Sequence, residues 1–284
     1  MTMAASPSST RASDSTDLGA IARRIRGEIV SLSHKSRAPH LASSLSCVDI
    51  LVAAYWGGGF NIGPANHDAP DRDRIVLSKG HAAAALYATL AERGFFERKI
   101  LDEYNADGGR LAEHPGPGCV PGVEAATGSL GHGLPIGLGM ALAARIQKRP
   151  TKVLVVMSDG ECNEGSVWEA AMMAPAKNAG NLTAVVDFNK WQATGRSQEV
   201  MSLMPLADKF RDFGWRAEMV PGHDIAALTA AMAKGADGSG KPLALIADTV
   251  KGKGISFMED DNNWHYRIPK EDEVAAAHRE LGLI

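Results

Sequence analysis

The sequence contains little cysteine, with only Cys47, Cys119 and Cys162 in a chain of 284 residues. A small, odd number of widely separated cysteines argues against a disulfide framework and favours a reducing compartment. The three residues also lack the closely paired spacing of zinc ligands. We therefore expect a cytoplasmic protein without a zinc site.

Long apolar runs and a strong net charge are also lacking. We find no run of about 18 apolar residues, so we expect no membrane-spanning segment and no membrane partner. The net charge of -3 gives no reason to expect a nucleic-acid partner. Residues 1–17 are rich in Ser, Thr and Ala and have no apolar core like that of a secretory signal. We expect them to form a disordered tail before a single domain over 18–284.

The chain does have the alternation of apolar strands and helices that is typical of an α/β fold. Buried strands are predicted at 152–157, 182–188 and 243–250, and a short extended segment at 74–77. Helices are predicted at 18–32, 48–56, 82–93, 134–145, 165–178 and 225–234, with Pro175 kinking or shortening the fifth. Strands that are apolar throughout and alternate with helices predict a parallel sheet with helices on both faces.

Two of the predicted strands end in residues suited to a metal and an anion. Asp159 and Asn189 lie 30 positions apart, the distance of a strand, a crossover helix and the next strand. Because parallel strands end at the same edge of a sheet, the two side chains should meet there. Asp159 by itself could be a helix cap, but a carboxylate with an amide oxygen suits Mg²⁺ or Ca²⁺. Gly160 would let a diphosphate approach the main chain and the start of the next helix.

Four segments carry a resemblance to a known family. In chain order they are RDRIVLSKGHAAAALYA, HPGPGCVPGVEAATGSLGHGLPIGLGMA, SDGECNEGSVWEA and KGKGISFMEDDNNWH. Together with Asp-Gly at one strand end and Asn at the next, they resemble the thiamine-diphosphate-binding domain of transketolases from Leu18 to the C-terminus. The resemblance implies the thiamine-diphosphate-binding (pyrophosphate-domain) fold. It also implies thiamine diphosphate and Mg²⁺ as cofactors, with Ca²⁺ or Mn²⁺ as alternative metals.

The resemblance implies a role for each matching residue. The metal ligands would be Asp159, Asn189 and the main-chain carbonyl of Trp191. Gly160, His81 and His265 would lie at the diphosphate, and Gly128, Ser129 and Leu130 at the aminopyrimidine. The catalytic channel would be lined by His40, His81, His114 and His265. Glu164 would lie at a subunit interface, in a carboxylate network that links two cofactor sites. Through this network, Glu164 would contribute to both catalysis and cofactor binding.

Two positions depart from the family pattern. Ser158 stands where the motif usually begins with glycine, and His132 stands where many relatives have glutamine, a change that could affect proton handling or substrate preference. The other histidines, His34, His67, His223 and His278, are expected to be ordinary surface or core residues.

The chemistry of thiamine diphosphate accounts for the histidines. The cofactor becomes a carbanion at C2 of its thiazolium, attacks a ketose carbonyl and retains a two-carbon fragment after cleavage. The protein positions the substrate and moves protons. Histidine suits proton transfer because it titrates near neutrality.

The resemblance also implies a partner. A full-length transketolase continues into a pyrimidine-binding domain that supplies the activating glutamate. We therefore expect the first subunit of a split transketolase, which would form an α₂β₂ assembly with a C-terminal transketolase subunit. The assembly would act on sugars with a phosphate or sulfonate end group. Two alternatives stay open: the α subunit of a thiamine-diphosphate-dependent 2-oxo-acid dehydrogenase, and a non-catalytic, cofactor-binding regulatory subunit.

Overall fold

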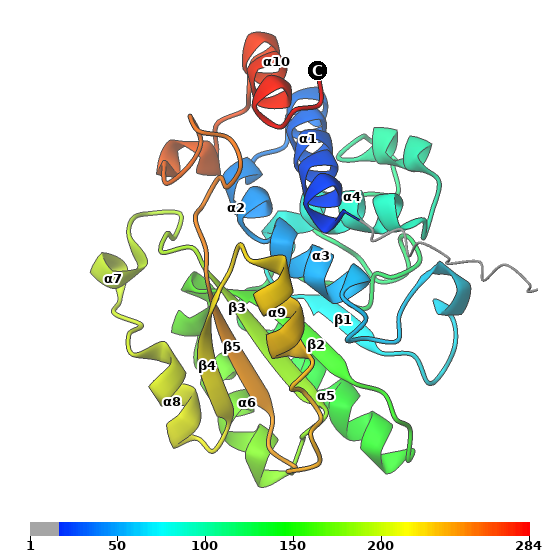
Figure 1. Cartoon of the computed structure of the whole chain (residues 1–284), viewed down its shortest axis with the longest axis vertical. Coiled ribbons are helices and arrows are strands. Elements are labelled where there is room, and N and C mark those ends of the chain that lie inside the picture. The colour runs from blue at the N-terminus through cyan, green and yellow to red at the C-terminus, as the bar shows by residue number, and fades with distance from the viewer. Residues whose placement is uncertain (1–16) are drawn as a thin grey trace, which may run out of the picture.

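A five-stranded sheet forms the centre of the computed structural model, which describes residues 17–284 (Figure 1). The strands are β1 (Arg74–Leu77), β2 (Val153–Ser158), β3 (Leu182–Phe188), β4 (Arg216–Pro221) and β5 (Leu243–Asp248). Their order is β1-β2-β3-β5-β4, and every pairing is parallel. The predicted α/β fold with a parallel sheet is therefore confirmed.

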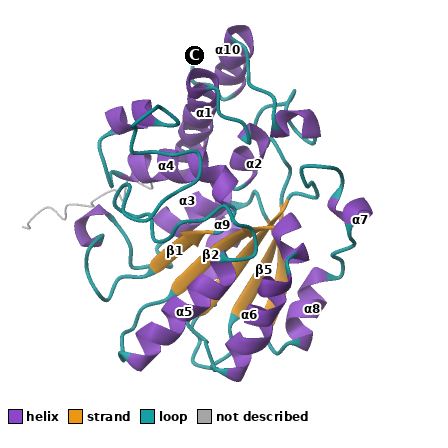
Figure 2. Ribbon diagram, turned by 180° about the vertical axis from the view of Figure 1, so that it is seen from behind, coloured by secondary structure: helices purple, strands orange, loops and turns teal. Residues whose placement is uncertain are grey.

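Helices cover both faces of this sheet. On one face the sheet shares a hydrophobic core with α1 (Leu18–Ser36), α3 (Val48–Trp56), α4 (Ala83–Arg93) and α9 (Ile225–Met232). The opposite face packs against α5 (Gly133–Ile146), α6 (Gly165–Ala176) and α8 (Leu206–Asp212), and Figure 2 shows α5 and α6 in front of the strands. The remaining α-helices are α2 (Leu41–Ser46), α7 (Ser197–Val200) and α10 (Glu271–Glu280).

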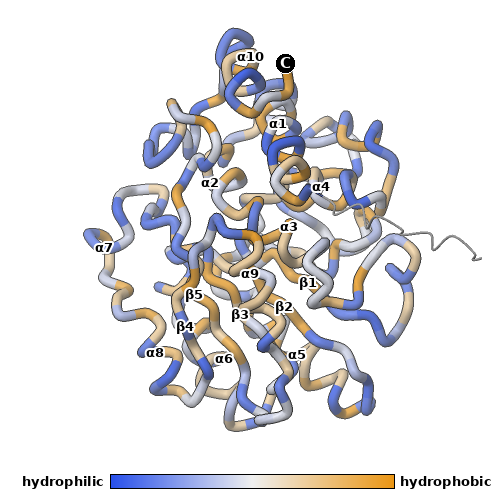
Figure 3. The backbone as a smooth tube through the Cα atoms, in the orientation of Figure 1, coloured by the Kyte–Doolittle hydropathy of each residue, from blue (hydrophilic) through white to orange (hydrophobic). Residues whose placement is uncertain are grey.

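The central strands are apolar on both sides because each side faces a separate hydrophobic core. In β2, Leu154 and Val156 belong to the core under α1, α3, α4 and α9. Val153 and Val155 belong to the core under α5, α6 and α8. This double burial gives the uninterrupted apolar sequence from which the strand was predicted. In Figure 3 the strands are correspondingly hydrophobic, whereas α10 is largely hydrophilic.

Several element ends differ from the prediction. The helix expected at 165–178 ends at Ala176, with Pro175 in its last turn. The first helix continues to Ser36, and the Asp17 carboxylate caps its start by accepting from the Ala20 N–H at 2.9 Å. Apart from Asp17, the tail predicted over 1–17 lies outside the described residues. Within residues 17–284, we find no helix that is both long enough and apolar enough to cross a membrane.

Strand β4 was not predicted, and its place at the edge of the sheet explains why. It pairs with a single strand, β5; Glu218 is half-buried and Met219 is exposed. An edge strand with charged and exposed residues lacks the continuous apolar pattern of a central strand.

Candidate functional site

The carboxyl ends of β2 and β3 bring Asp159 and Asn189 together. Ser158 of β2 is in register with Asp187 of β3, so the residues that follow leave the sheet side by side. The Lys190 N–H, next to Asn189, donates to Asp159 Oδ2 at 2.9 Å. Both side chains are buried, and Asn189 lines a cavity of about 400 Å³. Asp159 and Asn189 therefore lie at neighbouring strand ends, as predicted, with Asn189 at the cavity and the Asp159 carboxylate just behind its lining residues.

Asp159 is held rigidly by the main chain and by one side chain around it. Its Oδ1 accepts from the Gly160 N–H at 2.8 Å, and its Oδ2 also accepts from Ser197 Oγ at 2.8 Å. Burial raises the pKa of this carboxyl to about 6, against the lowering effect of the Ser197 hydrogen bond. A nearby cation would favour the charged carboxylate and offset its loss of solvent.

The donor set fits a hard cation that takes few protein ligands. Among residues 17–284, no group of three or more His, Cys, Asp or Glu side chains is placed to hold a metal. The Asp159 carboxylate, the Asn189 amide oxygen and a main-chain carbonyl at Trp191 would leave most of the coordination shell to phosphate oxygens and water, as is usual for Mg²⁺. Asn189 Oδ1 already accepts from the Trp191 N–H at 3.1 Å, which orients the amide.

The cavity also has polar atoms without a protein partner. Asn163 Oδ1, Gln192 Nε2 and His40 Nδ1 are buried and unpaired in the described part of the chain, and all three residues line the cavity. Buried polar atoms are normally hydrogen-bonded, so these atoms are suited to meet a polar ligand. At Gly160, a Cβ would lie 3.1 Å from Gln192 Cγ, which shows how closely the chain packs here.

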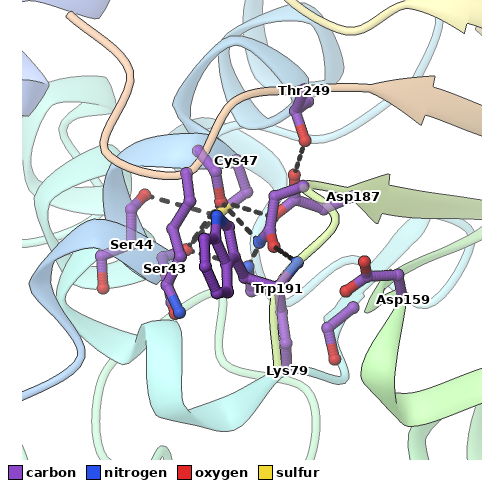
Figure 4. Close-up of polar contacts among 12 residues, drawn as sticks. Ser43, Ser44, Cys47, Lys79, Asp159, Asp187, Trp191 and Thr249 are labelled. Carbon is purple, nitrogen blue, oxygen red and sulfur yellow. Dashed lines mark hydrogen bonds and ion pairs between the residues drawn. The ribbon is translucent and has the colours of Figure 1, made fainter. Parts of the chain in front are cut away.

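A buried ion pair lies directly beneath the strand ends and was not predicted. Lys79 Nζ lies 2.5 Å from Asp187 Oδ2 and donates to the Ser43 carbonyl at 2.8 Å (Figure 4). Ser46 Oγ and Thr249 Oγ1 donate to the same carboxylate. Burial alone would raise the pKa of Asp187, but the Lys79 ammonium holds it below its usual range. An aspartate inside an apolar strand and a lysine within a family motif were the signals available in the sequence.

Four predicted histidines cluster at the cavity and form what we call its histidine side. His40, His81, His114 and His265 all line it. The ring centroid of His40 lies 5.4 Å from that of His81, 6.2 Å from His114 and 4.9 Å from His265. His40 has a left-handed backbone with φ of 67°, and its N–H donates to the His265 carbonyl at 2.7 Å. An uncommon backbone conformation of this kind is maintained by surrounding contacts and is frequent at functional sites.

The cavity environment keeps the buried histidines neutral. Burial, with the charges of His114 and Lys251, lowers the pKa of His40 to about 4. Burial, with Lys251 and His40, lowers that of His265 to about 3, and burial lowers the pKa of His81 well below its ordinary value. Neutral imidazoles each offer one donor and one acceptor, so their tautomers decide what they present to a ligand.

The other predicted residues divide between the cavity and the surface. Gly128, Leu130, Gly160, Glu164 and Trp191 line the cavity. Glu164 is also exposed, so a second chain could reach it. Ser129 and His132 are not among the lining residues, and His132 is exposed.

Sequence reasoning missed several lining residues. They are Ser43, Asn163, Gln192, Ala193 and Thr194. Only Asn163 lies inside a quoted motif, so only it carried a signal. The histidines expected to be ordinary do not line the cavity, and each has a hydrogen-bond partner outside it: His34 with the Pro269 carbonyl, His67 with the Pro64 carbonyl, His223 with Asp49, and His278 with Ser31.

Comparison with known proteins identifies the family. The family model described as transketolase, thiamine diphosphate binding domain, matches residues 20–284. The chain belongs to the transketolase family. This transketolase chain is 39% identical over 256 residues to one of the apulose-4-phosphate transketolase subunits of Phocaeicola vulgatus, with 90% of each chain covered. It is 40% identical over 242 residues to the 6-deoxy-6-sulfo-D-fructose transketolase subunit SqwG of a Clostridium species, covering 85% of this chain and 88% of that one.

Solved transketolases share the fold. A transketolase from Campylobacter jejuni superposes with a TM-score of 0.86 at 26% identity, covering 93% of this transketolase chain and 42% of that one. A mutant transketolase from Pichia stipitis superposes with a TM-score of 0.86 at 27% identity, and the match covers 95% of this chain and 41% of that one. The chain thus spans about two-fifths of the length of these solved transketolases. The family places it among transketolase-type transferases and favours this class over a 2-oxo-acid dehydrogenase.

Proposed function

We propose that this chain is the N-terminal subunit of a split transketolase, which transfers a two-carbon ketol unit from a ketose to an aldose. One observation carries the proposal: a single cavity joins the strand ends at Asn189 and Gly160 to the four histidines. A metal-anchored diphosphate at the strand ends would place the rest of the cofactor beside the histidines.

The proposed roles follow from the position of each group. Asp159, Asn189 and the Trp191 carbonyl would hold Mg²⁺, for which Ca²⁺ or Mn²⁺ could substitute. Gly160, His81 and His265 would bind the diphosphate, and Gly128, Ser129 and Leu130 would flank the aminopyrimidine. When bound, thiamine diphosphate supplies the carbanion that attacks the ketose carbonyl.

The histidines would orient the substrate and move its protons. His40, His81, His114 and His265 are close enough to act on one bound sugar. The rings of His40, His81 and His265, which burial keeps neutral, can accept a proton from a donor hydroxyl and, once charged, return it to an acceptor oxygen. His265 is buried and His40 and His81 are half-buried, so their hydrogen bonds are stronger than they would be in water.

A C-terminal subunit would complete the site. The bacterial relatives are named as transketolase subunits, and Glu164 is exposed where a second chain could contact it. We propose an α₂β₂ assembly in which the partner binds the pyrimidine and Glu164 links the two cofactor sites. We place the assembly in the cytoplasm, because Cys47, Cys119 and Cys162 are all free thiols.

The partner would also recognise the acidic end of the sugar. The named substrates of the two bacterial relatives carry a phosphate and a sulfo group. In the described part of this chain, the residues that line the cavity include no lysine or arginine. A cationic contact to such an end group would therefore come from outside this cavity, which supports a substrate shared between two chains.

The deciding experiment compares the purified chain with the chain mixed with its C-terminal partner. Both samples contain Mg²⁺ and thiamine diphosphate, and ketol transfer and 2-oxo-acid decarboxylation are assayed in parallel. We expect ketol transfer only in the mixture. Robust transfer by the chain alone, with mass spectrometry excluding a copurified partner, would contradict the split-enzyme proposal. Decarboxylation without ketol transfer would favour the dehydrogenase alternative.

A further inference from the structure

Lys251 is a buried lysine that contacts the histidine side of the cavity. Its Nζ lies 2.8 Å from His265 Nδ1 and donates to Asn262 Oδ1 at 2.7 Å. The orientation of the Asn262 amide is set independently, because its Nδ2 donates to the Ala193 carbonyl at 3.1 Å. The amide oxygen must therefore face Lys251, and the lysine acts as a donor in this cluster.

The main chain on both sides of this contact is anchored. The Asp260 N–H donates to the Lys251 carbonyl at 2.8 Å, and the Gly252 N–H donates to the Ala42 carbonyl at 3.0 Å. The His265 carbonyl accepts from the His40 N–H at 2.7 Å. Lys251 and His265 thus approach each other from fixed positions, and their contact does not depend on a mobile surface side chain.

The contact has a consequence for the protons of His265. A neutral imidazole carries one N–H and one acceptor nitrogen. A charged lysine has N–H donors and no lone pair, so the Lys251 ammonium can only donate to Nδ1, which makes that nitrogen the acceptor and leaves the proton on Nε2. Burial lowers the pKa of Lys251 to about 7, so the ammonium is present at and below neutral pH. Ser43 Oγ lies 3.4 Å from Nδ1, which is a weaker contact.

We propose that Lys251 is a positioning residue that holds His265 in the Nε2–H tautomer, so that this side chain presents a hydrogen-bond donor to the cavity. The group that His265 meets there would be an acceptor, such as a phosphate oxygen or an oxygen that gains negative charge during the reaction. The role in catalysis rests on the proposed function, whereas the tautomer does not.

The tautomer can be measured directly on the purified full-length chain. Histidine labelled with ¹⁵N gives two-bond proton–nitrogen correlations whose pattern separates the Nε2–H and Nδ1–H forms. The signals of His265 are assigned by their loss in His265→Gln. We expect the Nε2–H pattern for His265 near neutral pH. An Nδ1–H pattern in the wild-type chain would overturn the proposal, and this measurement needs no other variant to fold.

Lys251→Met tests whether the lysine causes this preference, because methionine keeps an unbranched stem and removes the donor. We expect His265 to shift to a mixture of the two tautomers. Lys253→Met is the matched control: Lys253 lies in the same loop and pairs with Glu259 at 3.1 Å near the surface, so the wild-type pattern should persist. A pure Nε2–H pattern in Lys251→Met would overturn the positioning role.

The effect on the reaction is measured with the partner subunit present. Turnover of Lys251→Met should fall by about 10–100-fold, by analogy with partners that orient metal-ligating histidines, and Lys253→Met should match the wild type. A shifted tautomer with wild-type turnover would overturn the role in catalysis. Failure of the proposed function would differ, since the wild-type complex itself would then lack ketol transfer.

Discussion

The two sides of the cavity are built differently. The strand-end side comprises Asn189, which lines the cavity, and the neighbouring Asp159; these residues follow two adjacent strands whose ladder sets the distance between them. The histidine side, His40, His81, His114 and His265, comes from four segments far apart in the chain. Regular hydrogen bonding positions the first side, whereas specific buried contacts, such as His40 N–H to the His265 carbonyl, position the second. The strand-end side should therefore depend on few residues, and the histidine side on many.

The largest expected effect comes from the strand-end side. Asp159→Ala removes the carboxylate proposed to bind Mg²⁺, so metal-dependent binding of thiamine diphosphate and all ketol transfer should be lost. The sheet should persist, because β2 and β3 pair through their main chains. Calorimetry and circular dichroism of the assembled complex measure both effects. Asp208→Ala, an exposed change on α8, is the control; unchanged, metal-independent cofactor affinity in Asp159→Ala would disprove the assignment.

The buried pair beneath the strand ends should control stability. Lys79→Met leaves Asp187 fully buried without its cation, and breaking such a pair costs about 3–5 kcal/mol. Urea denaturation would show this as a lower free energy of unfolding. Lys35→Met removes an exposed pair with Asp102, so it should have little effect. Equal stability of the two variants would show that the Lys79 pair has no special importance for the fold.

The histidine side should control turnover. His114→Ala and His265→Ala should each reduce ketol transfer by roughly 10²–10⁴-fold if each assists proton transfer. Cofactor affinity should fall less for His114→Ala than for His265→Ala, because His265 is the residue placed at the diphosphate. His132→Gln is the control, since His132 is exposed outside the cavity. Wild-type turnover in both alanine variants would mean that the catalytic site lies elsewhere.

The smallest expected effect is a pH dependence of stability from the histidine side. The pKa of His40 is lowered to about 4 and that of His265 to about 3, mainly by burial. Such groups bind protons more tightly in the unfolded chain, so they destabilise the fold as pH falls below about 6.5. When the pH is lowered from 7 to 5, the unfolding temperature of the isolated chain should fall less for His265→Gln than for the wild type. An equal fall in both proteins would mean that His265 does not contribute to the pH dependence of stability.

The sequence by itself determined the elements whose pattern is local. The helix at Val48–Trp56 and the strands at Arg74–Leu77 and Leu182–Phe188 have the predicted bounds. The meeting of Asp159 and Asn189 followed from the geometry of parallel strands. The cofactor and its ligand roles came from the family resemblance, since no spacing alone names thiamine diphosphate.

Only the tertiary structure decided which distant side chains meet. His132 and His114 lie in the same motif and both are exposed, yet His114 lines the cavity and His132 does not. Lys79 pairs with Asp187, which lies 108 positions later in the sequence. Lys251 contacts His265, which lies 14 positions later. Apolar periodicity encodes which face of an element is buried, but it carries no information on which polar groups will be paired there. Those pairs form because a buried charge or polar atom is costly without a partner, and the complete fold determines which partners are within reach.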